Sequence, residues 1–129
     1  MTFVADTHAI VWHLMDEARL GKAARRAFRT ADEGRVVCYV PVISLVEISL
    51  LHEKGRLRPS LARILETLAG HTGYSILGLD LEQVKAFAAF PAVRDPMDRL
   101  ILAAASATGS RLISADEVLE GRGVERIWD

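Results

Sequence analysis

Short apolar runs alternate along this chain with longer segments in which apolar residues recur at three- or four-residue spacing. The short runs are rich in β-branched residues and end at turn-forming or acidic residues, which is typical of buried strands. This pattern predicts strands at residues 2–5, 36–40, 75–79, 111–114 and 124–128.

The longer segments predict helices. In residues 17–32, for example, apolar positions recur at helical spacing, and Gly34 follows as a helix terminator. The predicted helices are residues 17–32, 44–54, 59–69, 81–90 and 96–108, with a short helix or turn at 116–120. Strands that alternate with helices predict βαβ units and a mostly parallel sheet.

Length and composition set the broad class. The chain has 129 residues, half of them apolar, and a net charge of −1. We expect one domain over residues 1–129, and the charge excludes a broadly basic nucleic-acid binder. The single cysteine, Cys38, cannot form an internal disulfide. A single cysteine fits a reducing cytoplasm, and the sequence shows no signal peptide and no apolar run of membrane-spanning length.

Four acidic residues stand at the ends of apolar runs. Asp6 and Asp116 follow predicted strands, whereas Glu47 and Asp98 lie in the first turns of predicted helices. In parallel sheets, ligands bind beyond the carboxyl ends of the strands, so these four side chains are expected to meet at one rim. Clustered carboxylates repel one another unless a cation compensates them, and oxygen ligands of this kind suit Mg²⁺ or Mn²⁺.

Each acid also has a capping interpretation. Ser44 and Glu47 match the S-x-x-E capping box, and Asp95 before Pro96 is a natural helix N-cap. Such carboxylates contribute about 0.3–1 kcal/mol each through the helix dipole alone. Taken together, the four acids favour a metal site, whereas Asp95 is explained by capping. The histidines show no zinc-site spacing, and only His8, beside Asp6, is a weak candidate for a site.

The same residues fall within motifs of a known family. Residues 6–12 are DTHAIVW, 44–47 SLVE, 54–57 KGRL, 94–101 RDPMDRLI and 112–116 LISAD, and the chain closes with Ile127 and Trp128. In this order the motifs run nearly end to end, and the chain resembles PIN-domain ribonucleases, specifically the VapC-type toxins of type II toxin–antitoxin pairs.

The resemblance implies a three-layer α/β/α sandwich and metal-dependent cleavage of RNA. It implies an RNA substrate, a cognate antitoxin and a homodimer as partners. It assigns Asp6, Glu47, Asp98 and Asp116 as catalytic metal ligands, with Mg²⁺ or Mn²⁺ as the cofactor. It also implies supporting roles, in which Thr7, Ser44 and Ser114 orient carboxylates or waters, and Arg99 pairs with an acid or touches phosphate.

The chain departs from the family pattern at four positions, none of them a presumed ligand. Pro41 replaces a serine, Val46 a tryptophan, Val93 a histidine and Ser114 a threonine. The missing histidine at position 93 leaves open any role for an imidazole beside the substrate.

Surface features leave several alternatives open. Two basic groups are either solvated surfaces or phosphate-binding edges: Arg19, Lys22, Arg25, Arg26 and Arg29, and then Arg56, Arg58 and Arg63. We expect Trp12 to be a core or interface residue rather than a base-stacking platform. Six residues are expected to help form an antitoxin groove or a homodimer face: Leu50, Leu51, Leu61, Ile64, Leu65 and Leu68.

Other protein classes fit less well. A receiver domain needs paired acids after the first strand and a late lysine, but the last lysine here is Lys85. An aspartate-nucleophile phosphatase needs an acid two residues after Asp6, where His8 stands. A non-catalytic PIN-like scaffold that binds RNA or protein is the remaining alternative, and the intact acid set argues against it.

Overall fold

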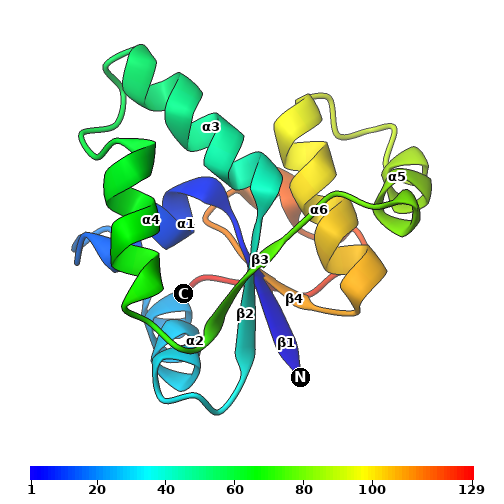
Figure 1. Cartoon of the computed structure of the whole chain (residues 1–129). Helices are drawn as coiled ribbons and strands as arrows, with labels where there is room; N and C mark the ends of the chain where they lie inside the picture. The colour runs from blue at the N-terminus through cyan, green and yellow to red at the C-terminus, as the bar shows by residue number, and fades with distance from the viewer.

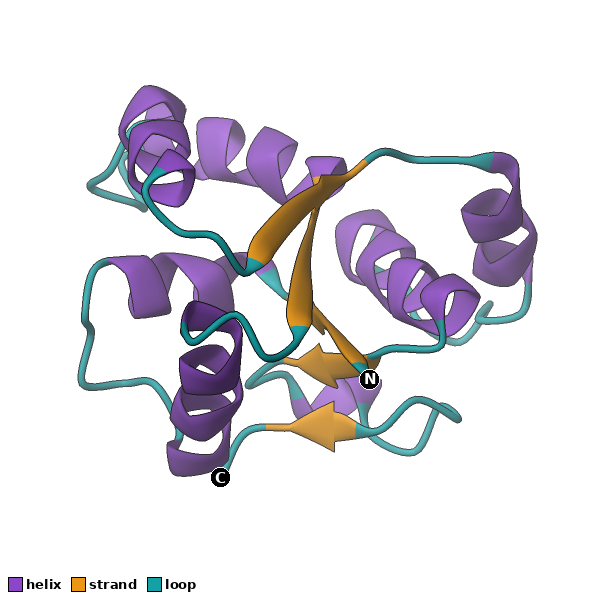
Figure 2. Ribbon diagram, turned by 60° about the horizontal axis from the view of Figure 1, so that its bottom comes forward, coloured by secondary structure: helices purple, strands orange, loops and turns teal.

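The computed structural model describes residues 1–129 and is built around a five-stranded sheet in the order β3-β2-β1-β4-β5 (Figures 1 and 2). All four neighbouring pairs are parallel. The strands are β1 (Thr2–Ala5), β2 (Val37–Pro41), β3 (Tyr74–Leu77), β4 (Arg111–Ile113) and β5 (Arg126–Ile127). The predicted sheet is therefore confirmed, and it is entirely parallel.

Helices cover both faces of the sheet, which confirms the three-layer α/β/α architecture (Figure 1). One face carries α1 (Thr7–Leu14), α2 (Lys22–Asp32), α3 (Val42–Glu53) and α4 (Leu61–Ala69). The other carries α5 (Leu81–Ala88), α6 (Pro96–Thr108) and one turn of 3₁₀ helix, η1 (Glu117–Leu119).

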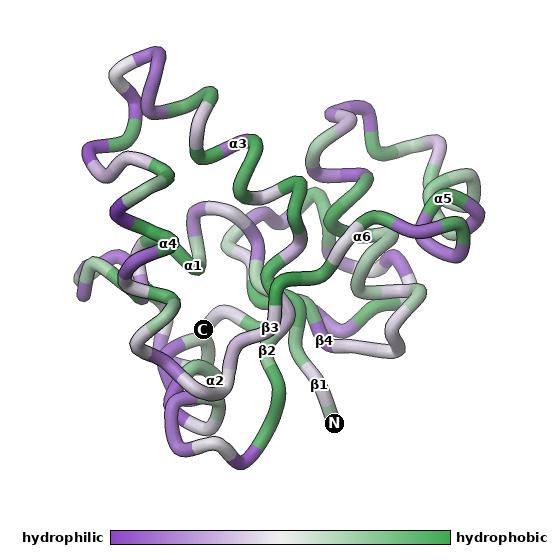
Figure 3. Tube along the Cα trace, viewed as in Figure 1, coloured by the Kyte–Doolittle hydropathy of each residue, from purple (hydrophilic) through white to green (hydrophobic).

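The central strand β1 shows why both faces are covered. Phe3 and Ala5 point into the core beneath α1 to α4, whereas Val4 points into the core beneath α6. Successive strand residues face opposite sides, so a strand buried on both faces is apolar throughout. In the hydropathy trace, β2 is largely hydrophobic, whereas the connection after α3 is largely hydrophilic (Figure 3).

The structure corrects several element boundaries. Helix α1 was not predicted, and the predicted helix at 17–32 begins only at Lys22, after a turn. Pro41 does not interrupt strand pairing but ends β2 in register with Leu77. Helix α3 then begins at Val42, two residues before the predicted start, with Pro41 in the N-cap position. None of the helices is both long and apolar enough to span a membrane.

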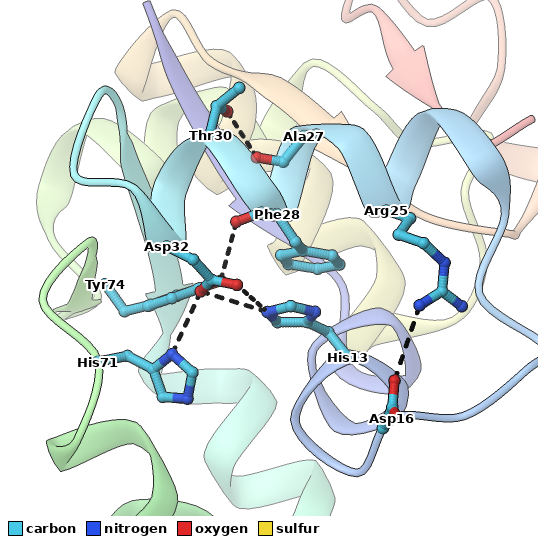
Figure 4. A network of polar contacts seen from close by, with 9 residues as sticks. All are labelled: His13, Asp16, Arg25, Ala27, Phe28, Thr30, Asp32, His71 and Tyr74. Atoms are coloured by element: carbon cyan, nitrogen blue, oxygen red, sulfur yellow. Dashed lines mark hydrogen bonds and ion pairs between the residues drawn. The ribbon is translucent and has the colours of Figure 1, made fainter.

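A polar network ties α1, α2 and the start of β3 together at Asp32 (Figure 4). The Asp32 carboxylate accepts a hydrogen bond from the Tyr74 hydroxyl at 2.8 Å, and it lies 3.1 Å from His13 Nε2 and 3.2 Å from His71 Nδ1. The His13 ring stacks on Phe28 with centroids 4.3 Å apart. Burial lowers the pKa of His13, and the Asp32 charge opposes this shift.

Candidate active site

All four predicted acids line one cavity of about 440 Å³, which we call the acid pocket. Asp6 follows β1, Glu47 lies on α3, Asp98 on α6, and Asp116 follows β4. The pocket also contains His8, Ala9, Trp12, Asp95 and Ala115. The structure thus brings together carboxylates from four separate segments, while their catalytic role stays a prediction.

Sheet topology explains why the pocket forms at this place. From β1 the chain moves to β2 and β3 on one side, and later returns to add β4 and β5 on the other. Adjacent crossovers therefore leave in opposite directions at β1 and β4, which opens a crevice beyond their carboxyl ends. Asp6 and Asp116 both stand at this crevice.

Asp6 is held from two sides. Its Oδ1 accepts a hydrogen bond from the Thr7 backbone N–H at 2.7 Å, and its Oδ2 accepts one from the Ser114 hydroxyl at 2.6 Å. Burial raises the pKa of Asp6, and the hydrogen bonds from Ser114 and Thr7 counter that shift by favouring the ionised form. Asp6 also serves as the N-cap of α1, so capping and presentation to the pocket coexist.

Ser114 connects Asp6 to Asp116. While its hydroxyl donates to Asp6, its oxygen accepts the Asp116 backbone N–H at 3.0 Å. The Asp116 carboxylate in turn accepts from Val118 N–H at 3.0 Å and caps η1. The predicted orienting role of Ser114 thus has a matching geometry, with its own hydroxyl as the link between two acids.

For the other two acids with a predicted capping role, Asp95 and Glu47, the structure gives opposite answers. Asp95 Oδ1 accepts hydrogen bonds from Met97 N–H at 2.9 Å and Asp98 N–H at 3.1 Å, so its predicted capping role is confirmed. The alternative capping box of Ser44 and Glu47 is wrong. Helix α3 starts before Ser44, whose buried hydroxyl has no hydrogen-bond partner. Glu47 therefore faces the pocket without a capping contact of its own.

Asp98 is a second acid of the pocket whose pKa is raised above its usual value. Burial, followed by the charges of Asp6, Asp95, Asp116 and Glu47, raises the pKa of Asp98 to about 7. All four neighbouring carboxylates therefore lie within electrostatic range of Asp98. Such a site favours a cation, because a bound cation offsets the repulsion that otherwise keeps this carboxyl protonated.

The raised pKa of Asp98 predicts how stability depends on pH. The folded protein holds this proton up to about pH 7, whereas the unfolded chain releases it near pH 3.8. The associated stability is fully present below pH 3.8 and is lost as pH rises through 7 in the absence of metal. We expect Asp98→Asn to flatten this dependence and to raise the metal-free unfolding free energy at neutral pH by about 1–2 kcal/mol, after solvent screening of a half-buried group.

Urea unfolding in EDTA at several pH values measures this effect. Glu82→Gln, which removes a first-turn carboxylate from α5 outside the acid pocket, is the matched control and should leave the pH dependence unchanged. An Asp98→Asn protein with the parent pH profile would show that the carboxylates do not interact as described.

The donor set fits a hydrated divalent cation. No three His, Cys, Asp or Glu side chains form a ready-made metal site, so the four carboxylates face one cavity without converging on a point. Mg²⁺ and Mn²⁺ suit this arrangement because they bind oxygen, and Mg²⁺ typically keeps several waters. Thr7 follows Asp6 directly, and Ser44 lies about one helical turn before Glu47. The hydroxyl groups of both residues are buried and have no hydrogen-bond partner, so they could bind waters of the hydrated cation.

Arg99 takes part in none of the ion pairs of the structure, so its predicted pairing with an acid is not observed, whereas its contact with phosphate stays a prediction. Its Nε donates to the Phe87 carbonyl at 2.9 Å, and its guanidinium lies 3.9 Å from the centre of the Phe87 ring. It forms no ion pair with an acid, and it packs α6 against α5 instead.

The structure also sorts the surface groups. Arg19, Arg56, Arg58 and Arg63 line a second cavity, whereas Lys22, Arg26 and Arg29 lie exposed on α2. Arg25 is half-buried on the same helix and pairs with Asp16 at 3.7 Å. Trp12, expected in a core or interface, is half-buried and lines both cavities. Among the six apolar residues assigned to a groove, Ile64 and Leu68 belong to the core, whereas Leu61, Leu65 and Leu50 line an apolar groove of about 480 Å³. The sixth, Leu51, is half-buried and lines neither.

Comparison with known proteins identifies the family of this chain. The family model of the PIN domain matches residues 3–123. The chain is 32% identical over 122 residues to Ribonuclease VapC22 of Mycobacterium tuberculosis, with 92% of this chain and 89% of that protein covered. This chain belongs to the PIN-domain family. The resemblance to VapC-type ribonucleases that the motifs indicated is confirmed.

Solved structures share the fold at low sequence identity. VapBC2 from Rickettsia felis, bound to a promoter DNA fragment, superposes with a TM-score of 0.72 at 13% identity over the whole of both chains. DNA-bound VapBC from Salmonella typhimurium gives a TM-score of 0.66 at 18% identity, with 98% of this chain and 96% of that chain covered. These similarities establish the fold.

Proposed function

We propose that this protein is a divalent-metal-dependent endoribonuclease that acts as the toxin of a toxin–antitoxin pair. The observation that carries the proposal is the acid pocket, in which four chain segments present carboxylates at the topological switch point of a PIN-domain fold. The relative with 32% identity is a ribonuclease, and structural neighbours are VapBC complexes, which supports both the reaction and the biological role.

Mg²⁺ or Mn²⁺ bound by Asp6, Glu47, Asp98 and Asp116 would activate water and offset charge on the scissile phosphate. The chain's own contribution is orientation. Ser114 and the Thr7 N–H fix both oxygens of Asp6, which sets the direction of this buried carboxylate and favours its ionised form against the effect of burial on its pKa. A cation held in the pocket would offset the charges that raise the pKa of Asp98 and would therefore favour the ionised form that can act as a ligand.

The proposed protein partner has a candidate surface. Exposed Val42, Val46, Leu50 and Leu65 border the apolar groove between α3 and α4. An antitoxin segment or a second copy of this chain would cover these side chains, in line with VapBC complexes among the structural neighbours. Light scattering of the protein alone and with its antitoxin distinguishes the two occupants.

The reaction is tested by incubating purified protein with a panel of single-stranded and hairpin RNAs. We expect cleavage with Mg²⁺ or Mn²⁺, none in EDTA, and recovery when the metal is restored. Cleavage that continues unchanged in EDTA would contradict the metal-dependent mechanism. The non-catalytic scaffold remains the alternative: RNA binding and measurable Mn²⁺ binding, with no cleavage anywhere in the panel, would favour it.

A further inference from the structure

A second cavity, of about 750 Å³, lies beside the acid pocket, and four arginines contribute to its lining. We call it the arginine groove. It runs between the end of α1 with its following turn, and the connection from α3 to α4. Its cationic members are Arg19, Arg56, Arg58 and Arg63. The connection after α3 is also a hydrophilic part of the trace (Figure 3).

The positive charge of this groove is largely uncompensated. Arg56, Arg58 and Arg63 take part in none of the ion pairs of the structure. Arg19 pairs with Glu17 at 3.6 Å, in an exposed contact that solvent weakens. Because the whole chain carries a net charge of −1, this concentration of guanidinium groups is local and calls for an anionic occupant.

Trp12 forms the boundary between the arginine groove and the acid pocket, since it lines both. The Arg19 guanidinium lies 4.5 Å from the centre of the indole ring, and the His8 ring lies 5.6 Å from it. Trp128 contacts the indole as well, at 5.8 Å between centroids, and helps to hold its orientation. A ligand that extends from the acid pocket into the arginine groove must therefore pass over Trp12.

We propose that the arginine groove binds the single-stranded RNA backbone that flanks the scissile phosphate, and that Trp12 stacks on a base at the entrance to the acid pocket. The phosphates of RNA would neutralise the unpaired arginines. Proteins that bind single-stranded nucleic acid commonly combine cationic side chains with an aromatic side chain on which a base stacks. The inference rests on the proposed nuclease function, because the groove is assigned to the RNA segment next to a scissile phosphate in the acid pocket.

Binding is tested without catalysis, by fluorescence anisotropy of a labelled oligouridylate of about 12 nucleotides in EDTA. The test variant combines Arg56→Ala, Arg58→Ala and Arg63→Ala. The matched control combines Lys22→Ala, Arg26→Ala and Arg29→Ala, which removes the same charge from an exposed face of α2. We expect the groove variant to bind at least about tenfold more weakly, with a salt slope smaller by about two, whereas the control keeps most of the affinity and slope.

Trp12→Leu tests the stacking contact separately. Leucine keeps apolar bulk beside Trp128 but has no aromatic face, so we expect roughly tenfold weaker binding with an unchanged salt slope. Trp12→Phe should recover most of the loss. Thermal unfolding of every variant verifies that the fold is intact.

Equal RNA affinity in the two triple variants overturns the proposal. If the groove variant binds RNA like the control but binds the antitoxin more weakly, the groove serves the antitoxin, and the proposal is overturned as well. Cleavage with Mn²⁺, measured in parallel, separates this inference from the proposed function. Groove-dependent binding without any cleavage would leave the RNA groove standing and refute the nuclease, whereas cleavage with groove-independent binding would do the reverse.

Discussion

Replacement of Asp6 by asparagine should reduce RNA cleavage by about a thousandfold or more while the protein stays folded. Asp6 is the acid held most firmly in the pocket, with hydrogen bonds to both carboxylate oxygens. A metal contributes several kcal/mol of transition-state stabilisation, and each 1.4 kcal/mol is a factor of ten in rate. Loss of a central ligand charge therefore has a large kinetic effect.

The same substitution should have little effect on stability. Burial raises the pKa of Asp6, so its charge is costly in the metal-free protein, and asparagine is an equally good N-cap for α1. We expect the unfolding free energy in EDTA to stay within about 1 kcal/mol of the parent value or to rise. Cleavage of labelled RNA with Mn²⁺ and urea unfolding in EDTA measure the two effects.

Asp80→Asn is the matched control for this experiment. Asp80 is also a helix N-cap, where it accepts the Gln83 N–H at 2.9 Å, but it lies outside the acid pocket. It should leave cleavage unchanged. Parent-level cleavage by Asp6→Asn would remove Asp6 from the catalytic set, and a large loss of stability would show that its main role is structural.

Alanine at Gly73 should destabilise the fold by about 3 kcal/mol or more, which is the second large effect that we expect. A Cβ at this position would overlap the backbone carbonyl of Ala31 and approach its Cα to 3.1 Å. Neither side can yield easily, because Ala31 is fully buried and the Gly73 carbonyl accepts a hydrogen bond from Cys38 N–H at 2.9 Å. The methyl group would therefore push the start of β3 away from α2.

Gly78→Ala provides the comparison, because a Cβ there meets no atom within 4 Å. We expect its unfolding free energy to change by less than about 1 kcal/mol, in either direction. Urea unfolding monitored by circular dichroism distinguishes the two variants. If both glycine substitutions had the same small effect, the close contact between Gly73 and Ala31 would not restrain the fold.

The accuracy of the sequence prediction followed the strength of local patterns. Helix α6 was predicted with its observed bounds, because Asp95, Pro96 and Gly109 mark both ends chemically. Helix α1 was missed because THAIVWHL is apolar on nearly every side, and a short apolar run does not distinguish a buried helix from a strand. Ser44 was placed at a helix start because its spacing to Glu47 matches a capping box, although Pro41 already starts that helix.

Contacts between residues far apart in the sequence were not predicted by local patterns. Sequence reasoning assigned Arg19 to the basic group on α2, but the turn after α1 carries it to Trp12 and into the groove with Arg56. The sequence left two possible partners for Arg99, an acid or a phosphate, whereas in the packing of α6 against α5 its guanidinium contacts the Phe87 ring. These partners come from distant parts of the chain, and no local periodicity specifies which of them meet.

The sequence by itself determined the parallel α/β fold, the family motifs and the four acids, because each depends on residues that are adjacent or one helical turn apart. The sequence also predicted that those acids meet at one rim, as the shared pocket confirms. Only the tertiary structure decided that Ser114 joins Asp6 to Asp116 and that Trp12 separates the acid pocket from the arginine groove. The physical reason is that crossover connections and helix packing set distances between residues far apart in the chain, and these distances exist only in the folded protein.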